Sequence, residues 1–262
     1  MKNERKLSRW RCLCAYDGTE FNGWQKQTNR QSVQDKIEEC LAEILGTPVR
    51  TIGAGRTDAG VHASGQVFHF DARWNHSSQA LLQALRVSLP VGISPRKIDP
   101  VPASFHAHLS AKGKRYIYRI CKGWAMPERD RFVHSMKERK LDLDAMQAAA
   151  SCFLGTHDFA AFSANRRNGE EEPTIRTLWR SEWRDCGEEL HFITEGQGYL
   201  YKMVRSMVGS MIDVGRGRIP FQEIAEILQT NKRTARVVSA PARGLSMDKV
   251  FYRLPQRANF TK

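Results

Sequence analysis

The spacing of apolar residues divides the first half of the chain into strand and helix segments. Apolar side chains occupy alternate positions from Trp10 to Tyr16, which predicts a strand over residues 9–16. After Ser32 they recur every three or four positions, which predicts a helix that Ser32 caps and Gly46 ends. The same criteria predict strands over 49–54 and 66–72, a polar loop over 55–65, a helix over 77–88, and a proline-rich boundary region over 90–102.

The second half opens with a predicted strand over residues 115–120, in which Tyr116, Tyr118 and Ile120 share one face. A stripe of apolar residues after Leu200 predicts a buried helix that ends near Gly215. The other predicted elements are helices over 142–153 and after Pro220, a charged loop over 165–173, and strands over 174–183, 189–194 and 245–252.

Strands connected mostly as hairpins, with a few helices between them, favour an α+β fold. We expect an N-terminal α+β domain over residues 1–105 and a C-terminal α+β domain over 106–262. A cleft between two such domains is the default position for a binding site.

Composition narrows the class of protein. The chain has 262 residues and a formal charge of +13, which favours a polyanionic partner such as a nucleic acid. The alternative is a basic protein that has no such partner. No segment approaches the roughly 20 apolar residues of a membrane span, and no apolar signal core follows the N-terminus, so we expect a cytoplasmic protein without membrane contact. The 6 cysteines form no C-x-x-C pair, which favours reduced, packed thiols over zinc ligands or disulfides.

The polar loop is the strongest candidate for chemistry. It places one carboxylate, Asp58, between Arg56 and several glycines, which allow the backbone to approach a ligand closely. The alternative is a tight turn in which Asp58 only caps backbone amides. The glycine spacing fits neither a dinucleotide-binding fingerprint nor a phosphate-binding loop. The pair His106-x-His108 is the only histidine spacing that suggests ligands, and we expect no metal there.

Residues 55–63, Gly-Arg-Thr-Asp-Ala-Gly-Val-His-Ala, resemble the signature loop of the tRNA pseudouridine synthase A family. Weaker matches follow in the family's order and cover nearly the whole chain, at residues 21–25, 33–34, 64–67, 111–118, 155–159, 203–209 and 240–245. One departure is His108, where the family often has an arginine. This difference affects one possible phosphate contact.

The resemblance implies roles for four residues. Asp58 corresponds to the catalytic aspartate, Arg56 to the loop arginine, Tyr116 to the active-site tyrosine and Arg205 to the helix arginine. An arginine near Asp58 would keep the carboxylate ionised, and a tyrosine could lie flat on the base and exclude water. On the residues alone, the alternatives are a surface arginine for Arg205 and an ordinary sheet tyrosine for Tyr116.

Other residues are candidates for substrate binding. Tyr118 shares the face of Tyr116 and competes with it, and Arg56 could fill the gap that a flipped uridine leaves. Candidate phosphate contacts, proposed as a group, are Arg115, Arg119, Lys112, Lys114, Arg166, Arg167, Arg216 and Arg218.

The resemblance also implies a fold and an activity. It implies two ferredoxin-like domains of the RNA-recognition type, with mainly antiparallel sheets around a central catalytic cleft. It further implies a homodimer that isomerises uridine to pseudouridine at nucleotides 38–40 of the tRNA anticodon stem-loop, and the reaction needs no cofactor. The aspartate could attack the ribose, attack C6 of the base, or act through a glycal. Two rival functions remain, an RNA-cleaving enzyme and a non-catalytic RNA-binding module.

Overall fold

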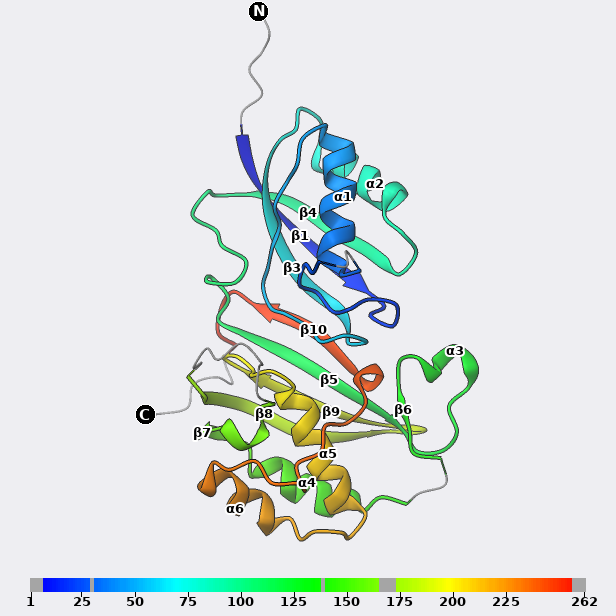
Figure 1. Cartoon of the computed structure of the whole chain (residues 1–262), viewed down its shortest axis with the longest axis vertical. Coiled ribbons are helices and arrows are strands. Elements are labelled where there is room, and N and C mark those ends of the chain that lie inside the picture. The colour runs from blue at the N-terminus through cyan, green and yellow to red at the C-terminus, as the bar shows by residue number, and fades with distance from the viewer. Residues whose placement is uncertain (1–6, 29–30, 138–139, 165–172, 256–262) are drawn as a thin grey trace, which may run out of the picture. The chain divides into compact units, whose positions relative to one another are not determined.

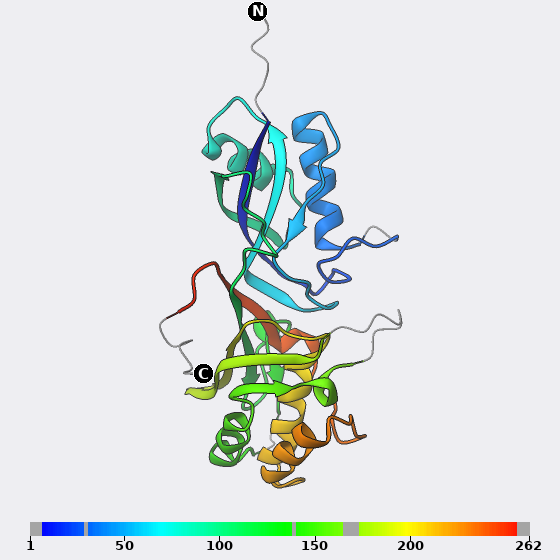
Figure 2. The same cartoon turned by 90° about the vertical axis from the view of Figure 1, so that its left-hand side faces the viewer.

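The computed structural model describes residues 7–28, 31–137, 140–164 and 173–255, and the chain forms two compact units. The N-terminal unit comprises Met1–Lys112 with Met247–Tyr252, and the C-terminal unit comprises Gly113–Ser246 with Arg253–Lys262. Both combine helices with mainly antiparallel strands (Figures 1 and 2), which confirms the predicted α+β class. None of the helices in the described ranges has the length and hydropathy that crossing a membrane requires.

The N-terminal unit is built on a sheet in which β1 lies between two antiparallel neighbours, β3 and β4. The short β2 pairs with β3, and the last strand, β10, follows β3 in the sheet order. Helices α1 and α2 contact each other, and α2 packs on β4 (Figure 1). The bounds are β1 (Leu7–Tyr16), α1 (Val33–Leu45), β2 (Ile52–Gly53), β3 (His62–Arg73), α2 (Ser78–Ser88), β4 (Ile93–Val101) and β10 (Leu245–Phe251).

The C-terminal unit is built on an antiparallel sheet with the order β5, β9, β8 and β7. The short β6 pairs with β5 in parallel, and α4, α5 and α6 gather on one face of the sheet (Figure 2). The bounds are β5 (Gly113–Cys121), α3 (Pro127–Asp130), β6 (His134–Ser135), α4 (Leu143–Ser151), β7 (Gly155–Asp158), η1 (Ala160–Phe162), β8 (Ile175–Cys186), β9 (Glu189–Gly196), α5 (Met203–Gly215), α6 (Gln222–Thr230) and η2 (Ala242–Gly244).

The periodic segments of the sequence form the predicted elements. Alternate residues of β1 are buried, as the strand pattern predicts. Ser32 caps α1 by accepting a hydrogen bond from the backbone N–H of Asp35, and the Asp35 side chain completes a capping box. Gly46 ends this helix with a φ of 70°. In α5 the stripe Met203, Met207 and Met211 is fully buried, which confirms that this helix faces the core.

Three predictions about the first half differ from the structure. The region over 90–102 contains β4, because an edge strand tolerates Pro95 and Pro100 where a central strand would not. Strand β3 begins at His62, so the predicted loop is shorter, because Gly65 lies directly against the backbone of Asp248 in β10. Strand β2 has two residues, because only Ile52 and Gly53 of the predicted segment pair with β3, at His69 and Phe68.

Candidate active site

The residues between β2 and β3 form the segment 54–61, which we call the Asp58 loop. A hydrogen bond of 3.1 Å from the backbone N–H of Val61 to the carbonyl oxygen of Asp58 closes a tight turn. Gly60 has a φ of 75° at the third position of this turn, which suits glycine. Asp58 is half-buried and Arg56 is exposed. The loop therefore presents the two predicted side chains from a turn of defined geometry.

Polar contacts hold the Asp58 loop at Gly55 and Thr57, which precede the aspartate. The Tyr16 and Thr57 hydroxyls are hydrogen-bonded at 2.9 Å, and the Trp24 backbone N–H donates to the Thr57 carbonyl at 3.1 Å. The Gln66 side-chain amide donates to the Gly55 carbonyl at 2.8 Å. The backbone on the N-terminal side of Asp58 is thus tied to three different segments.

Two glycines allow the neighbouring chain to approach the Asp58 loop closely. A Cβ on Gly23 would lie 2.3 Å from the Thr57 carbonyl oxygen and 3.1 Å from the Asp58 carbonyl carbon. A Cβ on Gly18 would lie 2.1 Å from the Val61 carbonyl oxygen. Real Cβ atoms do not occupy such positions, so any larger residue must displace the loop.

Histidines also meet this loop. His108, where the family often has an arginine, places Nδ1 at 2.9 Å from the Ala54 carbonyl oxygen, at the loop's first residue. His106 Nδ1 accepts the backbone N–H groups of His108 and Leu109, at 3.2 and 3.1 Å. No group of three potential metal-ligating His, Cys, Asp or Glu side chains occurs among the described residues. The described contacts of His106 and His108 are therefore hydrogen bonds to backbone groups.

In the C-terminal unit, the two candidate tyrosines lie on the same buried face of β5 but in different surroundings. Tyr118 is fully buried, and its hydroxyl donates to the Pro241 carbonyl at 2.9 Å. Burial raises the pKa of Tyr118 well above its usual value. The Tyr116 ring meets the Tyr199 ring edge to face, with centroids 5.0 Å apart. Tyr118 thus has a structural hydrogen bond that accounts for its hydroxyl.

Arg205 lies in the first turns of α5 and is half-buried. Its Nε donates to the Ala240 carbonyl at 2.8 Å, and its own carbonyl accepts the Ala240 N–H at 2.9 Å. A Cβ on Gly209 would lie 1.8 Å from the Val238 carbonyl oxygen, so α5 and residues 238–240 are in close contact. These contacts fix the position from which the guanidinium extends.

The predicted phosphate contacts differ in how they are paired. Arg115 is bound to the buried Glu195, with Nη2 at 2.7 Å from Oε1, and this carboxylate also accepts from Arg180 and Trp179. Lys114 is buried, and burial lowers its pKa to about 8, so it is not a typical surface cation. Arg218 pairs with Asp213 at 2.9 Å, whereas Lys112 and Arg119 are exposed. Arg166 and Arg167 lie outside the described residues, and Arg216 is half-buried.

The sequence motif singles out Asp58 but not the residues that hold its loop. The sequence pattern places Tyr16 in a strand, and Trp24 and Gln66 in the matched motifs. No periodic signal could have found them, because Tyr16 and Thr57 are 41 positions apart. The available hint is the set of glycines at 18, 23 and 53, which lie directly against the Val61 backbone, the Thr57 backbone and the Trp24 side chain, respectively.

Comparison with known proteins gives a consistent result. A family model described as tRNA pseudouridine synthase matches residues 13–109 and 149–253. The chain is 41% identical over 244 residues to "tRNA pseudouridine synthase A" of Acetivibrio thermocellus, covering 92% of this chain and 98% of the relative. It is 39% identical over 248 residues to the protein of that name from Geobacillus kaustophilus, covering 93% and 94%. A relative of the same name from Brevibacillus brevis is 39% identical, covering 94% and 100%.

Proposed function

As a member of the tRNA pseudouridine synthase family, the chain isomerises uridine to pseudouridine in tRNA, and we propose that Asp58 is the nucleophile. The observation that carries this proposal is the Asp58 loop itself. It presents a half-buried carboxylate from a tight turn whose backbone is held by buried hydrogen bonds. A carboxylate that only capped backbone amides would not need contacts of this kind at the preceding residue.

The reaction breaks the N1–C1′ bond, turns the uracil within the site and joins C5 to C1′, and the C5 proton then leaves. Attack at the ribose, attack at C6 and elimination through a glycal all require an ionised carboxylate. The two alternative functions would leave different RNA products. A nuclease would shorten it, and a binding module would leave it unchanged.

We assign supporting roles to Tyr116 and Arg205. Tyr116 stacks on the target base and excludes water, which would otherwise trap a detached base. Arg205 is assigned to fixing the direction of the Asp58 carboxylate during the reaction. The structural hydrogen bond of the Tyr118 hydroxyl to Pro241 supports the choice of Tyr116 over Tyr118.

We further propose that the substrate is the anticodon stem-loop at nucleotides 38–40 and that the enzyme acts as a homodimer. The formal charge of +13 supports an extended contact with phosphates, and the exposed Arg56, Lys112 and Arg119 are available for it. Arg56 is assigned to the space that the flipped uridine leaves.

The test is Asp58→Asn, assayed on an anticodon stem-loop with a single uridine among nucleotides 38–40. Pseudouridine formation leaves the RNA mass constant and changes its reactivity toward carbodiimide. We expect the variant to lose the activity and keep its affinity for RNA, because the amide retains the shape of the side chain without its charge. The matched control is Asp99→Asn, which removes a carboxylate of the same unit that pairs with Arg11 at 3.0 Å.

The control should retain both activity and affinity. Turnover of Asp58→Asn within about tenfold of the parent would overturn the assignment. Shortened RNA would indicate a nuclease, and unmodified stem-loop beside modified full-length tRNA would overturn the choice of the stem-loop as a sufficient substrate.

A further inference from the structure

Tyr16 anchors the residue that immediately precedes the proposed nucleophile. It lies at the end of β1, is 4% exposed, and its hydroxyl is hydrogen-bonded to that of Thr57 at 2.9 Å. The Gln66 side chain also interacts with this hydroxyl and holds the Gly55 carbonyl. Burial raises the pKa of Tyr16 well above its usual value, so the phenol is protonated at neutral pH. The buried Tyr16 hydroxyl thus contacts Thr57 of the Asp58 loop and also Gln66, which holds the same loop at Gly55.

A second anchor reaches the same residue from the start of α1. The first two backbone N–H groups of this helix, on Val33 and Gln34, donate to the carbonyls of Gly23 and Trp24 at 3.1 and 3.0 Å. The Trp24 N–H in turn donates to the Thr57 carbonyl. The helix N-terminus, whose amides lack partners within the helix, is therefore used to orient the segment that meets Thr57.

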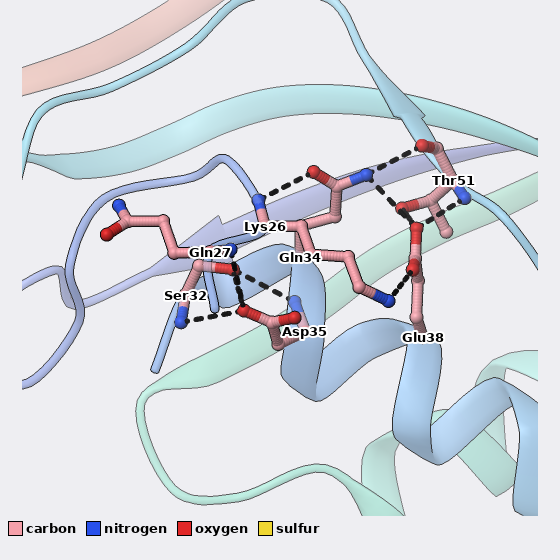
Figure 3. A network of polar contacts seen from close by, with 7 residues as sticks. All are labelled: Lys26, Gln27, Ser32, Gln34, Asp35, Glu38 and Thr51. Atoms are coloured by element: carbon pink, nitrogen blue, oxygen red, sulfur yellow. Dashed lines mark hydrogen bonds and ion pairs between the residues drawn. The ribbon is translucent and has the colours of Figure 1, made fainter. Parts of the chain in front are cut away.

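A buried polar network braces this second anchor (Figure 3). The Gln34 side chain accepts the Lys26 backbone N–H at 3.0 Å and donates to the Thr51 carbonyl at 2.9 Å and to Glu38 at 3.0 Å. Glu38 accepts the Thr51 backbone N–H at 2.8 Å. Because the chain before β2 and the chain after Trp24 are tied to one helix, this anchor is rigid.

We propose that Tyr16 is a positioning residue for catalysis, which fixes the Thr57 peptide and thereby the direction of the Asp58 carboxylate. The inference rests on the proposed role of Asp58. Trp24 holds Thr57 through backbone atoms, which a side-chain substitution does not remove. The Tyr16 hydroxyl is the anchor that a minimal substitution can remove.

The proposal predicts an effect on turnover and not on binding. Without the hydroxyl contact, the peptide before Asp58 gains freedom to rotate, and the carboxylate spends less time in the attacking geometry. Contacts between exposed cations and RNA phosphates do not depend on this direction. The expected change is therefore a lower kcat at a nearly constant KM.

The experiment compares Tyr16→Phe with Tyr252→Phe on the stem-loop substrate. Each variant loses one hydroxyl of the N-terminal unit that makes a hydrogen bond of 2.9 Å, but the Tyr252 hydroxyl donates to the Ala107 carbonyl and not to a residue of the Asp58 loop. We expect Tyr16→Phe to lower kcat about tenfold with KM within about twofold, and Tyr252→Phe to keep both values within about twofold.

Two variants of Thr57 test the pairing. Thr57→Val should lower kcat as Tyr16→Phe does, the double variant should be no slower than either single variant, and Thr57→Ser should restore turnover because it keeps a hydroxyl. Equal kcat for Tyr16→Phe and Tyr252→Phe, or independent effects in the double variant, would overturn the proposal. Should Thr57→Val fail to fold, the comparison of the two tyrosine variants decides alone.

Asp58→Asn in the same assay separates this inference from the proposed function. An active Asp58→Asn protein overturns the nucleophile and the positioning role with it. An inactive Asp58→Asn protein, together with a fully active Tyr16→Phe protein, overturns the positioning role only.

Discussion

The Asp58 loop of the N-terminal unit and strand β5 of the C-terminal unit hold the two side chains with proposed roles, Asp58 and Tyr116, in different ways. Asp58 lies outside regular structure, and contacts with β1, β3 and the chain before α1 set its backbone. Tyr116 lies within a continuous ladder, where it pairs with Thr194 of β9. A strand sets the side-chain direction of each residue by alternation, whereas a loop depends on the particular contacts that it makes.

This difference predicts which small structural changes should alter turnover. Loss of one contact in a ladder leaves the neighbouring pairs to hold the strand in place. Loss of one contact at the Asp58 loop moves the proposed nucleophile. Equal structural changes should therefore affect turnover more in the loop than on β5.

Among substitutions that keep Asp58, the largest effect on turnover is expected from Gly23→Ala. The new methyl group would lie 2.3 Å from the Thr57 carbonyl oxygen, and Gly23 has a φ of 81°, so the Asp58 loop must shift. We expect kcat to fall by at least about 100-fold, since a displacement of about 1 Å at a reacting group costs that much. Turnover per folded molecule, with circular dichroism to count folded molecules, is the measurement.

Gly46→Ala is the matched control for this substitution. Gly46 has a φ of 70° in the same unit, but nothing lies within 4 Å of its Cβ position. It should lose about 1 kcal/mol of stability from backbone strain and keep its turnover. Equal turnover in the two variants would show that the loop tolerates displacement.

The sequence predicts the positions of Tyr116 and Arg205 on regular elements better than it predicts the contacts around the Asp58 loop. Alternation places Tyr116, Tyr118 and Ile120 on one face of β5, which the structure buries, and the apolar stripe of α5 leaves Arg205 at its edge. The motif identified Asp58 but gave no partner for Thr57, because hydrophobic periodicity carries no information about which distant residues meet. The same limit explains Lys114, a predicted phosphate contact whose burial depends on the packing of its surroundings.

A second prediction concerns the response of the N-terminal unit to acid. His69 on β3 is 3% exposed, and its Nδ1 accepts the Ala107 backbone N–H at 3.1 Å. Burial, with smaller effects from Arg9 and His106, lowers its pKa to about 4. Below about pH 6.5 the unfolded chain takes up a proton at this residue that the folded chain refuses, so stability falls as the pH drops from about 6.5 to 4.

His69→Asn keeps an acceptor near the position of Nδ1 and removes the titration. Between pH 6.5 and 4 it should lose less stability than the parent, by on the order of 2 to 3 kcal/mol. Urea unfolding at several pH values measures this, with His76→Asn at an exposed position of the same unit as control. Parallel profiles for the parent and His69→Asn would contradict the assignment.

A small effect on turnover is expected from Tyr118→Phe, the counterpart of Tyr16→Phe on β5. The change removes the hydrogen bond to the Pro241 carbonyl, and the unpaired carbonyl should cost about 1 kcal/mol of stability. Turnover should stay within about threefold of the parent, because the ladder from Lys114 to Cys121 still holds the neighbouring Tyr116 against β9. Unfolding midpoints and kcat, measured beside those of Tyr16→Phe, make the comparison direct. A loss of turnover as large as that of Tyr16→Phe would show that contacts on the strand are as critical as those of the loop, and it would reopen the choice between Tyr116 and Tyr118.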